Sequence, residues 1–282
     1  MLAIGNRLSI DQPAPPMVKA SPDIDPFRFW ARAQFAAYRG CVAFIETVDA
    51  DGATGIGTGF HVGDGVFVTA RHVVEGMQSI KVGFDDDAVT QQLMTRSFND
   101  DFKIHGMFQS GRNYAEVKVI EGPLYHSDPT VDVACFKVAP HPTEFIPLGG
   151  HFNDYLHQYE LVLYRTLVMG YPPIPLTKRP VLVASVGEVN ALTDLYVGCK
   201  HPHFVVSTVA RGGFSGGPVL VAYNEYNPEG GTAALGLVTQ SLTENDKAPE
   251  HGYMAVLTVE PIYACLRENK MLPPCQSISP GD

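Results

Sequence analysis

The sequence has no apolar run approaching the roughly 20 residues that a membrane-spanning helix needs, and it is poor in basic residues. Its 282 residues include 20 Lys and Arg against 30 Asp and Glu, a formal net charge of −10. This acidic balance argues against a general binder of nucleic acids or of anionic membrane surfaces. The N-terminus lacks the basic segment and apolar segment of a secretory signal. We therefore expect neither nucleic acid nor membrane as a partner.

Cysteines are also few, and their pattern argues against a disulfide framework. The five cysteines are odd in number and scattered: Cys41, Cys135, Cys199, Cys265 and Cys275. Reduced, mostly buried thiols are expected, and together with the missing signal they favour a cytoplasmic protein. A hydrophobic content of 45% with 18% charged residues is typical of a globular chain that buries a sizeable core.

Two series of short strands follow an N-terminal arm. Residues 1–25 are rich in proline and predicted to be irregular, whereas Pro26–Tyr38 has aromatic residues at helical spacing. A closing helix is predicted over Val259–Lys270 and a frayed end over Pro273–Asp282. Evenly spaced strands with turn signals predict an all-β fold of barrels or a sandwich. The strands are expected at Cys41–Val48, Gly55–Val62, Val66–Ala70, Ser79–Phe84, Phe102–Phe108 (a weak signal), Ala115–Glu121, Val131–Val138, Tyr159–Gly170, Val181–Leu192, His203–Val209, Val219–Tyr223, Ala233–Ser241 and Tyr253–Leu257.

The stretch Gly212-Gly213-Phe214-Ser215-Gly216-Gly217-Pro218 sets one serine among four glycines. A serine hydroxyl is a poor nucleophile, so it needs a base and donors for the developing oxyanion. Glycine permits positive φ and close approach of another chain. The stretch therefore suits an exposed nucleophile beside backbone N–H donors; a tight hairpin with an ordinary serine is the alternative.

A serine nucleophile needs a histidine base and a carboxylate that orients the histidine. Of the ten histidines, His72 follows an apolar strand and begins a short turn, which can present its ring to a cleft. Asp132 precedes an apolar strand, where a buried carboxylate needs a hydrogen-bond partner. It is therefore preferred over Asp128 as the carboxylate that orients the histidine. Cys199-x-His201-x-His203 resembles part of a metal motif but lacks a fourth ligand, so no metal site is predicted.

These motifs together resemble a known family. The segments that carry the resemblance are Gly57-Thr58-Gly59-Phe60, Val68-Thr69-Ala70-Arg71-His72-Val73-Val74, Val131-Asp132-Val133-Ala134 and Gly213-Phe214-Ser215-Gly216-Gly217-Pro218. In this order they look like the trypsin-like (chymotrypsin-fold) serine proteases, most closely the bacterial HtrA-like branch without its PDZ domain. The resemblance implies two six-stranded barrels, at about 41–139 and 158–258, with the active site between them. A helix at about 260–270 and a tail, 271–282, would follow, and residues 1–40 would form the arm and the short helix.

The resemblance also implies roles for individual residues. His72, Asp132 and Ser215 would be the catalytic triad of a serine endopeptidase, and the N–H groups of Gly213 and Ser215 would form the oxyanion hole. The primary pocket would be built from Val209, Ala210, Thr239, Gln240 and Ser241 and would accept a small or medium apolar side chain. No cofactor is implied, and the partner is a protein or peptide substrate, with a regulatory partner or trigger left open.

Phe214 stands where secreted members of the family carry the aspartate that binds a new N-terminus after zymogen cleavage. Activation by such a cleavage is therefore not expected.

Two other functions remain in competition. A catalytically silent peptide-binding or scaffold protein could share the fold, although the complete set of His72, Asp132 and Ser215 argues against it. The pattern Gly213-x-Ser215-x-Gly217 also fits an α/β-hydrolase, but that fold requires acid and histidine after the serine.

Overall fold

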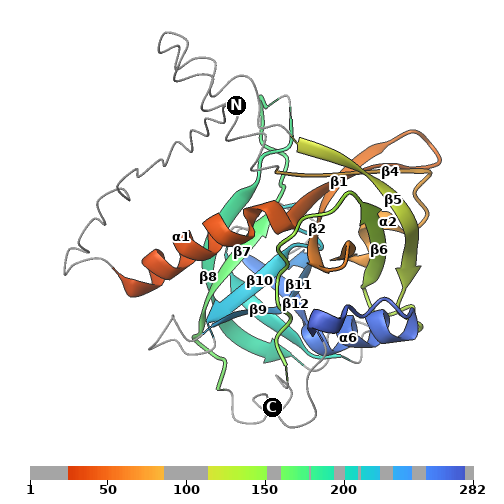
Figure 1. The fold of residues 1–282 in the computed structure, drawn as a ribbon. Helices are drawn as coiled ribbons and strands as arrows, with labels where there is room; N and C mark the ends of the chain where they lie inside the picture. Colours follow the sequence, from red (N-terminus) through yellow and green to blue (C-terminus); the bar gives the residue numbers. More distant parts are fainter. Residues whose placement is uncertain are drawn as a thin grey trace, which may run out of the picture.

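The computed structural model describes residues 25–85, 114–150, 160–177, 179–193, 201–208, 211–222, 231–242 and 252–276. These residues form two closed antiparallel β-barrels, with one helix before the first barrel and another after the second (Figure 1). The all-β fold of two six-stranded barrels and two flanking helices is therefore confirmed. No helix of the described part is long and apolar enough to cross a membrane.

The first barrel has the strand order β1-β2-β3-β6-β5-β4. All neighbouring strands are antiparallel, and the short helix α2 (Arg71–Val74) leaves the barrel directly after β3. A closed barrel pairs the edges that an open sheet would expose. Its strands are β1 (Val42–Val48), β2 (Thr54–Gly63), β3 (Val66–Thr69), β4 (Ser79–Asp85), β5 (Tyr114–Tyr125) and β6 (Ala134–Ala139).

The second barrel repeats this plan with the order β10-β11-β12-β9-β8-β7. A buried apolar cluster runs through both barrels without interruption. The helix α6 (Val259–Glu268) then returns to the first barrel, where Asn269 donates to the carbonyl oxygen of Tyr125 at 3.0 Å. The strands are β7 (Arg165–Gly170), β8 (Val183–Thr193), β9 (His203–Ser207), β10 (Pro218–Ala222), β11 (Thr232–Leu242) and β12 (Tyr253–Thr258).

The N-terminal helix α1 (Pro26–Tyr38) has the predicted bounds and fastens the second barrel to the start of the first. Asp25 caps it by accepting from the N–H of Phe27 at 3.1 Å, and Pro26 occupies its first turn. Trp30 is buried and donates from Nε1 to Thr232 of β11 at 3.1 Å. A short 3₁₀ helix, η1 (Arg39–Cys41), then leads into β1.

The two largest differences between the predicted and the observed strand starts are those of β6 and β7, which both begin late. The prediction of a strand over Val131–Val138 is wrong at its start, because Val131 and Val133 donate backbone hydrogen bonds within a tight turn and β6 begins at Ala134. The predicted Tyr159–Gly170 strand begins only at Arg165, since Leu163 adopts φ +72° in a turn. Apolar residues that pack in turns cannot be told from strand residues by hydrophobicity alone. The weak strand signal at Phe102–Phe108 lies outside the described residues.

The C-terminal segment is not frayed where it is described. It forms a 3₁₀ helix, η3 (Pro274–Gln276), whose last side chain is buried. Gln276 donates from Nε2 to the carbonyl oxygens of Val62 and Ile146, at 2.8 and 2.9 Å, and accepts from the N–H of Leu148. The Gln276 amide thus satisfies the hydrogen bonding of three backbone groups between the barrels. Neither the polarity of glutamine nor its position near the C-terminus predicted this role.

The described cysteines are free thiols. Cys41, Cys135 and Cys265 are buried and Cys275 is exposed, and Cys135 of β6 contacts Cys265 of α6 with 4.0 Å between the sulfur atoms. The hydrogen bond with Cys265, together with burial, raises the pKa of Cys135 and keeps it protonated.

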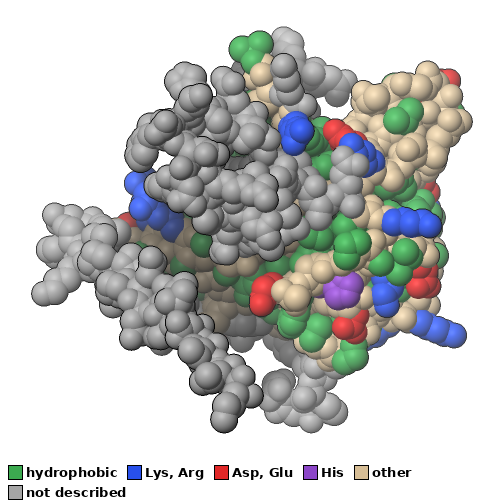
Figure 2. Space-filling model, turned by 45° about the horizontal axis from the view of Figure 1, so that its top comes forward, with side chains coloured by type: hydrophobic (Ala, Val, Ile, Leu, Met, Phe, Trp, Pro, Cys, Tyr) green, Lys and Arg blue, Asp and Glu red, His purple; other side chains and the backbone are tan. Residues whose placement is uncertain are grey.

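On the described surface seen in Figure 2, acidic and basic side chains are interspersed with small apolar areas.

The buried His61 generates a pH-dependent contribution to stability. Its Nδ1 lies 2.6 Å from the carbonyl oxygen of Glu144 and its Nε2 accepts from the N–H of Gly65, so the neutral ring is fully bonded. Burial lowers the pKa of His61 to about 4. Between pH 6.5 and 4 the unfolded chain binds a proton that the folded chain does not, so stability falls as the pH falls.

Lowering the pH from 7 to 5 is expected to remove about 2 kcal/mol of unfolding free energy through His61. Denaturant unfolding of the wild type and of His61→Gln at both pH values measures this, because the other histidines titrate in both proteins. An equal loss of stability in the two proteins would contradict the assignment.

Candidate active site

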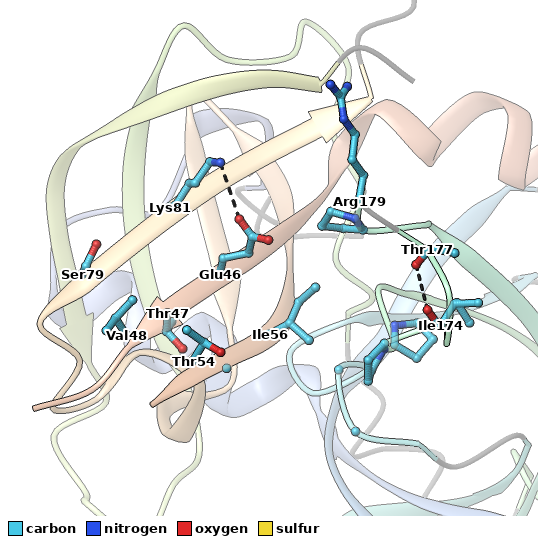
Figure 3. Close-up of a pocket in the computed structure, with 16 residues that line it drawn as sticks. Glu46, Thr47, Val48, Thr54, Ile56, Ser79, Lys81, Ile174, Thr177 and Arg179 are labelled. Carbon is cyan, nitrogen blue, oxygen red and sulfur yellow. Dashed lines mark hydrogen bonds and ion pairs between the residues drawn. The ribbon is translucent and has the colours of Figure 1, made fainter. Parts of the chain in front are cut away.

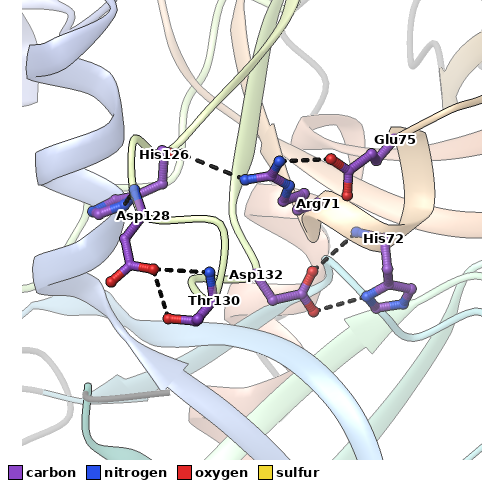
Figure 4. Close-up of polar contacts among 7 residues, drawn as sticks. All are labelled: Arg71, His72, Glu75, His126, Asp128, Thr130 and Asp132. Carbon is purple, nitrogen blue, oxygen red and sulfur yellow. Dashed lines mark hydrogen bonds and ion pairs between the residues drawn. The ribbon is translucent and has the colours of Figure 1, made fainter. Parts of the chain in front are cut away.

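His72 and Asp132 are held together by two hydrogen bonds (Figure 4). The ring Nδ1 of His72 lies 2.7 Å from one carboxylate oxygen, and the backbone N–H of the same residue donates to the other at 2.9 Å. An ionised carboxylate only accepts hydrogen bonds, so Nδ1 carries a proton and Nε2 of the neutral ring is left as a base. The His72 side chain is 51% exposed and therefore accessible to a substrate.

The turn before β6 explains why Asp132 rather than Asp128 meets the histidine. The Asp128 carboxylate accepts from the N–H and the hydroxyl of Thr130, at 2.9 and 2.7 Å, and so stabilises its own turn. That turn projects Asp132 toward α2. The α6 helix supports the same loop, because Glu268 accepts from the N–H and the hydroxyl of Ser127, both at 3.0 Å.

Arg71, the neighbour of His72, ties α2 to the loop that carries Asp132. Its guanidinium contacts Glu75 at 2.6 Å and reaches the carbonyl oxygen of His126 at 3.5 Å (Figure 4). It also lies 4.9 Å from the ring centroid of Tyr125. The carboxylate of Glu75 raises the pKa of Arg71, and the guanidinium lowers that of Glu75. Arg71 therefore positions the histidine, a function that its sequence motif did not indicate.

Ser215 lies in a loop whose turns leave two N–H groups unused. Phe214, Gly216 and Gly217 donate to the carbonyl oxygens of Arg211, Val238 and Phe214, at 3.5, 2.7 and 2.8 Å. Among the described residues, no acceptor takes the N–H of Gly213 or of Ser215. Gly213 has φ +89° at the third position of the turn that begins at Arg211, which is the signature of a type II turn.

Thr58 of β2 holds this loop from the other barrel. Its N–H donates to the carbonyl oxygen of Ser215 at 2.8 Å, and its hydroxyl donates to that of Gly213 at 2.6 Å. The same hydroxyl accepts from the N–H of Tyr171 at 2.9 Å. On the strand next to it, Thr69 donates to the carbonyl oxygen of Thr58 at 2.7 Å. Thr58 therefore places the serine loop beside the strand that leads to His72.

Phe214 anchors the same loop in the core. Its side chain is fully buried, and its ring packs where a Cβ at Gly170 would meet it at 2.6 Å. Gly216 is equally constrained, because a Cβ there would collide with the carbonyl oxygen of Thr58 and the hydroxyl of Thr69. Gly170 of β7 and Gly216 of the loop thus allow the close contacts that fix the loop.

The predicted pocket residues are only partly described. Val209 and Ala210 lie outside the described residues. Thr239 is buried and donates to the carbonyl oxygen of Ala255 at 3.2 Å, whereas Gln240 is exposed and Ser241 half-buried. All three belong to the part of β11 that extends beyond its partner β10, whose pairing ends at Pro218–Leu237. Within the described part of the chain, no strand pairs with this part of β11 on the side opposite β12.

The sequence matches the trypsin-like peptidase domain family over residues 57–226, more than half of the chain. The chain belongs to the trypsin-like peptidase family. The match includes His72, Asp132 and Ser215. No curated protein shows significant sequence similarity to this peptidase.

Solved structures with the same fold include two bacterial proteases. The active form of the Rv3671c protease from M. tuberculosis aligns over 98% of this chain and 100% of its own, with 20% identity and a TM-score of 0.56. Rv3671c has also been solved in an inactive form, with 18% identity, 86% and 95% coverage and a TM-score of 0.53. The HtrA-type protease AlgW with a tripeptide aligns over 87% of this chain and 64% of its own, with 14% identity and a TM-score of 0.56. At these identities the comparison supports the fold of the peptidase.

Replacing Thr58 with valine is expected to slow the reaction of Ser215 with a fluorophosphonate by about tenfold, because two buried backbone groups lose a partner at a cost of about 1–3 kcal/mol. Thr58→Ser keeps the hydroxyl and is the matched control. The labelling rate of Ser215 under native conditions is the measurement. Equal rates in the valine variant and the wild type would show that the loop does not depend on this hydroxyl.

Truncating Phe214 to alanine is expected to lower the unfolding free energy by about 3–5 kcal/mol, as for other buried phenylalanines. It should also slow fluorophosphonate labelling at temperatures where the variant remains folded. Phe214→Leu keeps most of the apolar volume and should label faster than the alanine variant. If the folded alanine variant labels at the wild-type rate, Phe214 contributes to stability alone.

Proposed function

We propose that the protein is a serine endopeptidase that hydrolyses peptide bonds through His72, Asp132 and Ser215. The observation that carries this proposal is the pair of unused N–H groups at Gly213 and Ser215, on the loop that Thr58 holds beside the His72 strand. A scaffold that only binds peptides has no need of two free donors flanking a serine. Such donors stabilise the negative charge that develops on a carbonyl oxygen during acyl transfer.

In the first half of the reaction, Ser215 Oγ attacks the carbonyl carbon of the scissile peptide bond and His72 Nε2 takes the hydroxyl proton. The N–H groups of Gly213 and Ser215 donate to the resulting oxyanion. Asp132 keeps the proton on Nδ1 and stabilises the imidazolium. The tetrahedral intermediate then collapses: the C–N bond breaks, His72 gives its proton to the leaving amine, and an acyl-enzyme remains.

In the second half, a water molecule replaces the amine. His72 Nε2 takes a proton from the water, the hydroxide oxygen bonds to the acyl carbon, and the same two N–H groups stabilise the second oxyanion. Collapse of this intermediate breaks the bond to Ser215 Oγ, which recovers its proton from His72. Every proton transfer uses a group of this chain, so the mechanism needs no cofactor.

The substrate is proposed to be an extended peptide. The part of β11 that runs beyond β10, at Thr239 and Ser241, offers main-chain hydrogen bonds to the residues before the scissile bond. Val209 and Ala210 are proposed to form the base of the primary pocket, with preference for a small or medium apolar side chain. The structure of AlgW with a tripeptide shows that a protein of this fold binds peptides.

We further propose that the serine loop needs no N-terminal cleavage to become ordered. A buried phenylalanine, Phe214, takes the position where an ion pair to a new N-terminus would be required, and Thr58 supplies the remaining contacts. A regulatory partner would then act on access to the site or on the substrate rather than on the formation of this loop.

Substituting Ser215 with alanine is expected to lower kcat for a peptide substrate by about 10⁶, and Asp132→Asn by about 10⁴, because the carboxamide favours the wrong tautomer of His72. The measurement is a peptide-library digest by the wild type and both variants, with rates from the best substrate found. Asp128→Asn changes the other carboxylate of the same turn, which accepts from Thr130 and not from His72, and is the matched control. Cleavage that persists in the Ser215 variant would refute Ser215 as the nucleophile.

A fluorophosphonate probe separates the endopeptidase from a catalytically silent scaffold. The probe should label the wild type at Ser215 and should fail to label Ser215→Ala. A wild type that stays unlabelled, with and without candidate partners, would contradict the enzymatic function and favour the scaffold.

A further inference from the structure

A chamber of about 810 Å³ opens beside the serine loop, on the side away from β11, between the two barrels. One wall is formed by β1, β2 and β4 of the first barrel and the other by the segment after β7 (Figure 3). Gly212 and Gly213 of the serine loop also line it. A group bound in this chamber therefore lies next to the N–H that is proposed to bind the oxyanion.

The first barrel presents an open strand edge to this chamber. Pairing between β2 and β3 begins only at Gly59 and Thr69, so among the described residues the preceding part of β2, residues 54–57, has a strand partner only in β1. The N–H of Thr58 points away from β1, because it donates to Ser215. N–H and C=O groups alternate in direction along a strand, so those of Ile56, two residues earlier, also point away from β1 and toward the chamber.

An extended peptide leaving Ser215 on this side would continue along that edge. Ile56 would pair with the main chain of the peptide as one more strand residue, and its side chain and Ile174 would contact the peptide from opposite walls (Figure 3). Because the open edge of β11 lies on the other side of Ser215, the chamber corresponds to the residues that follow the scissile bond.

The charges in the chamber favour an acidic side chain. Glu46 and Lys81 face each other across β1 and β4 at 3.6 Å and balance one another (Figure 3). Arg179 adds a second positive charge from the opposite wall, and no carboxylate of the described residues pairs with it. The chamber thus has a net positive charge in a chain whose formal net charge is −10. A guanidinium binds a carboxylate through two parallel hydrogen bonds.

We propose that this chamber binds the leaving-group segment of the substrate and selects an aspartate or glutamate within the first three residues after the scissile bond, with Arg179 as the selecting residue. The inference rests on the proposed endopeptidase function and adds a substrate class to it. Arg179 acts on affinity and orientation, since it does not touch the reacting atoms.

The test compares internally quenched peptides that share one sequence before the scissile bond and carry either Glu or Gln at the first, second or third position after it. The wild type should cleave the Glu peptide with a kcat/KM about 3- to 10-fold higher at one of these positions. Arg179→Gln should abolish this preference and bring the Glu to Gln ratio to about one. Arg28→Gln removes an exposed charge of α1 outside the chamber and should keep the preference. A Glu to Gln ratio of one in the wild type, or a ratio unaffected by Arg179→Gln, would overturn the inference.

Binding without catalysis separates this inference from the proposed function. Fluorescent peptides with a free N-terminus, corresponding to the leaving group, are titrated into Ser215→Ala with and without Arg179→Gln. Tighter binding of the Glu peptide that is lost with Arg179→Gln supports the chamber even if no peptide is cleaved. Cleavage without any Glu preference in rate or binding refutes the chamber and leaves the endopeptidase standing.

Discussion

The relation between the two barrels at the serine loop depends on one threonine. Each barrel is closed on itself, so no sheet continues from one into the other. Thr58 of the first barrel bonds to Ser215 and Gly213 of the second, and its carbonyl oxygen accepts from Thr69, three residues before His72. The proposed base and the proposed nucleophile are therefore positioned by the same residue. A displacement of Thr58 would move the proposed nucleophile relative to the proposed base. A displacement elsewhere in a barrel would instead be distributed over the strands of that barrel.

The way the serine loop is anchored has a consequence for regulation. An ion pair to a buried N-terminus forms only after cleavage, and taking two charges out of water is costly unless their hydrogen bonding is complete. The Phe214 side chain is buried by the hydrophobic effect in any state that has the second barrel folded. Room for its ring exists because Gly170 has no side chain. The proposal that this loop needs no processing of the chain therefore ties its order to the folding of the barrel.

Much of this architecture could be predicted from local patterns, and the exceptions have physical reasons. The alternation of short strands and turns predicted an all-β fold of barrels or a sandwich, and the resemblance of the motifs implied the two barrels. The aromatic segment Pro26–Tyr38 predicted the helix with its observed bounds. The pairing of His72 with Asp132 also agrees with the prediction from the motifs. The turn at Val131–Val133 was missed because its valines are buried like strand residues. The parts played by Thr58 and Gln276 arise from partners more than 100 positions away, to which no local pattern refers.

Closed barrels leave few places where a peptide can add a strand, and in this chain those places follow from unequal strand lengths. β2 begins before its partner β3 can pair with it, and β11 continues after β10 has ended. The two overhanging segments lie on either side of the serine loop, since Thr58 of β2 bonds to Ser215 and Val238 of β11 bonds to Gly216 and Gly217. The hydrogen bonds that hold the serine loop therefore lie where the pairing of β2 with β3 and of β11 with β10 ends, one on each side of Ser215. An extended chain that satisfies both open edges must pass over Ser215, so the geometry that would bind the substrate also places its backbone at the serine.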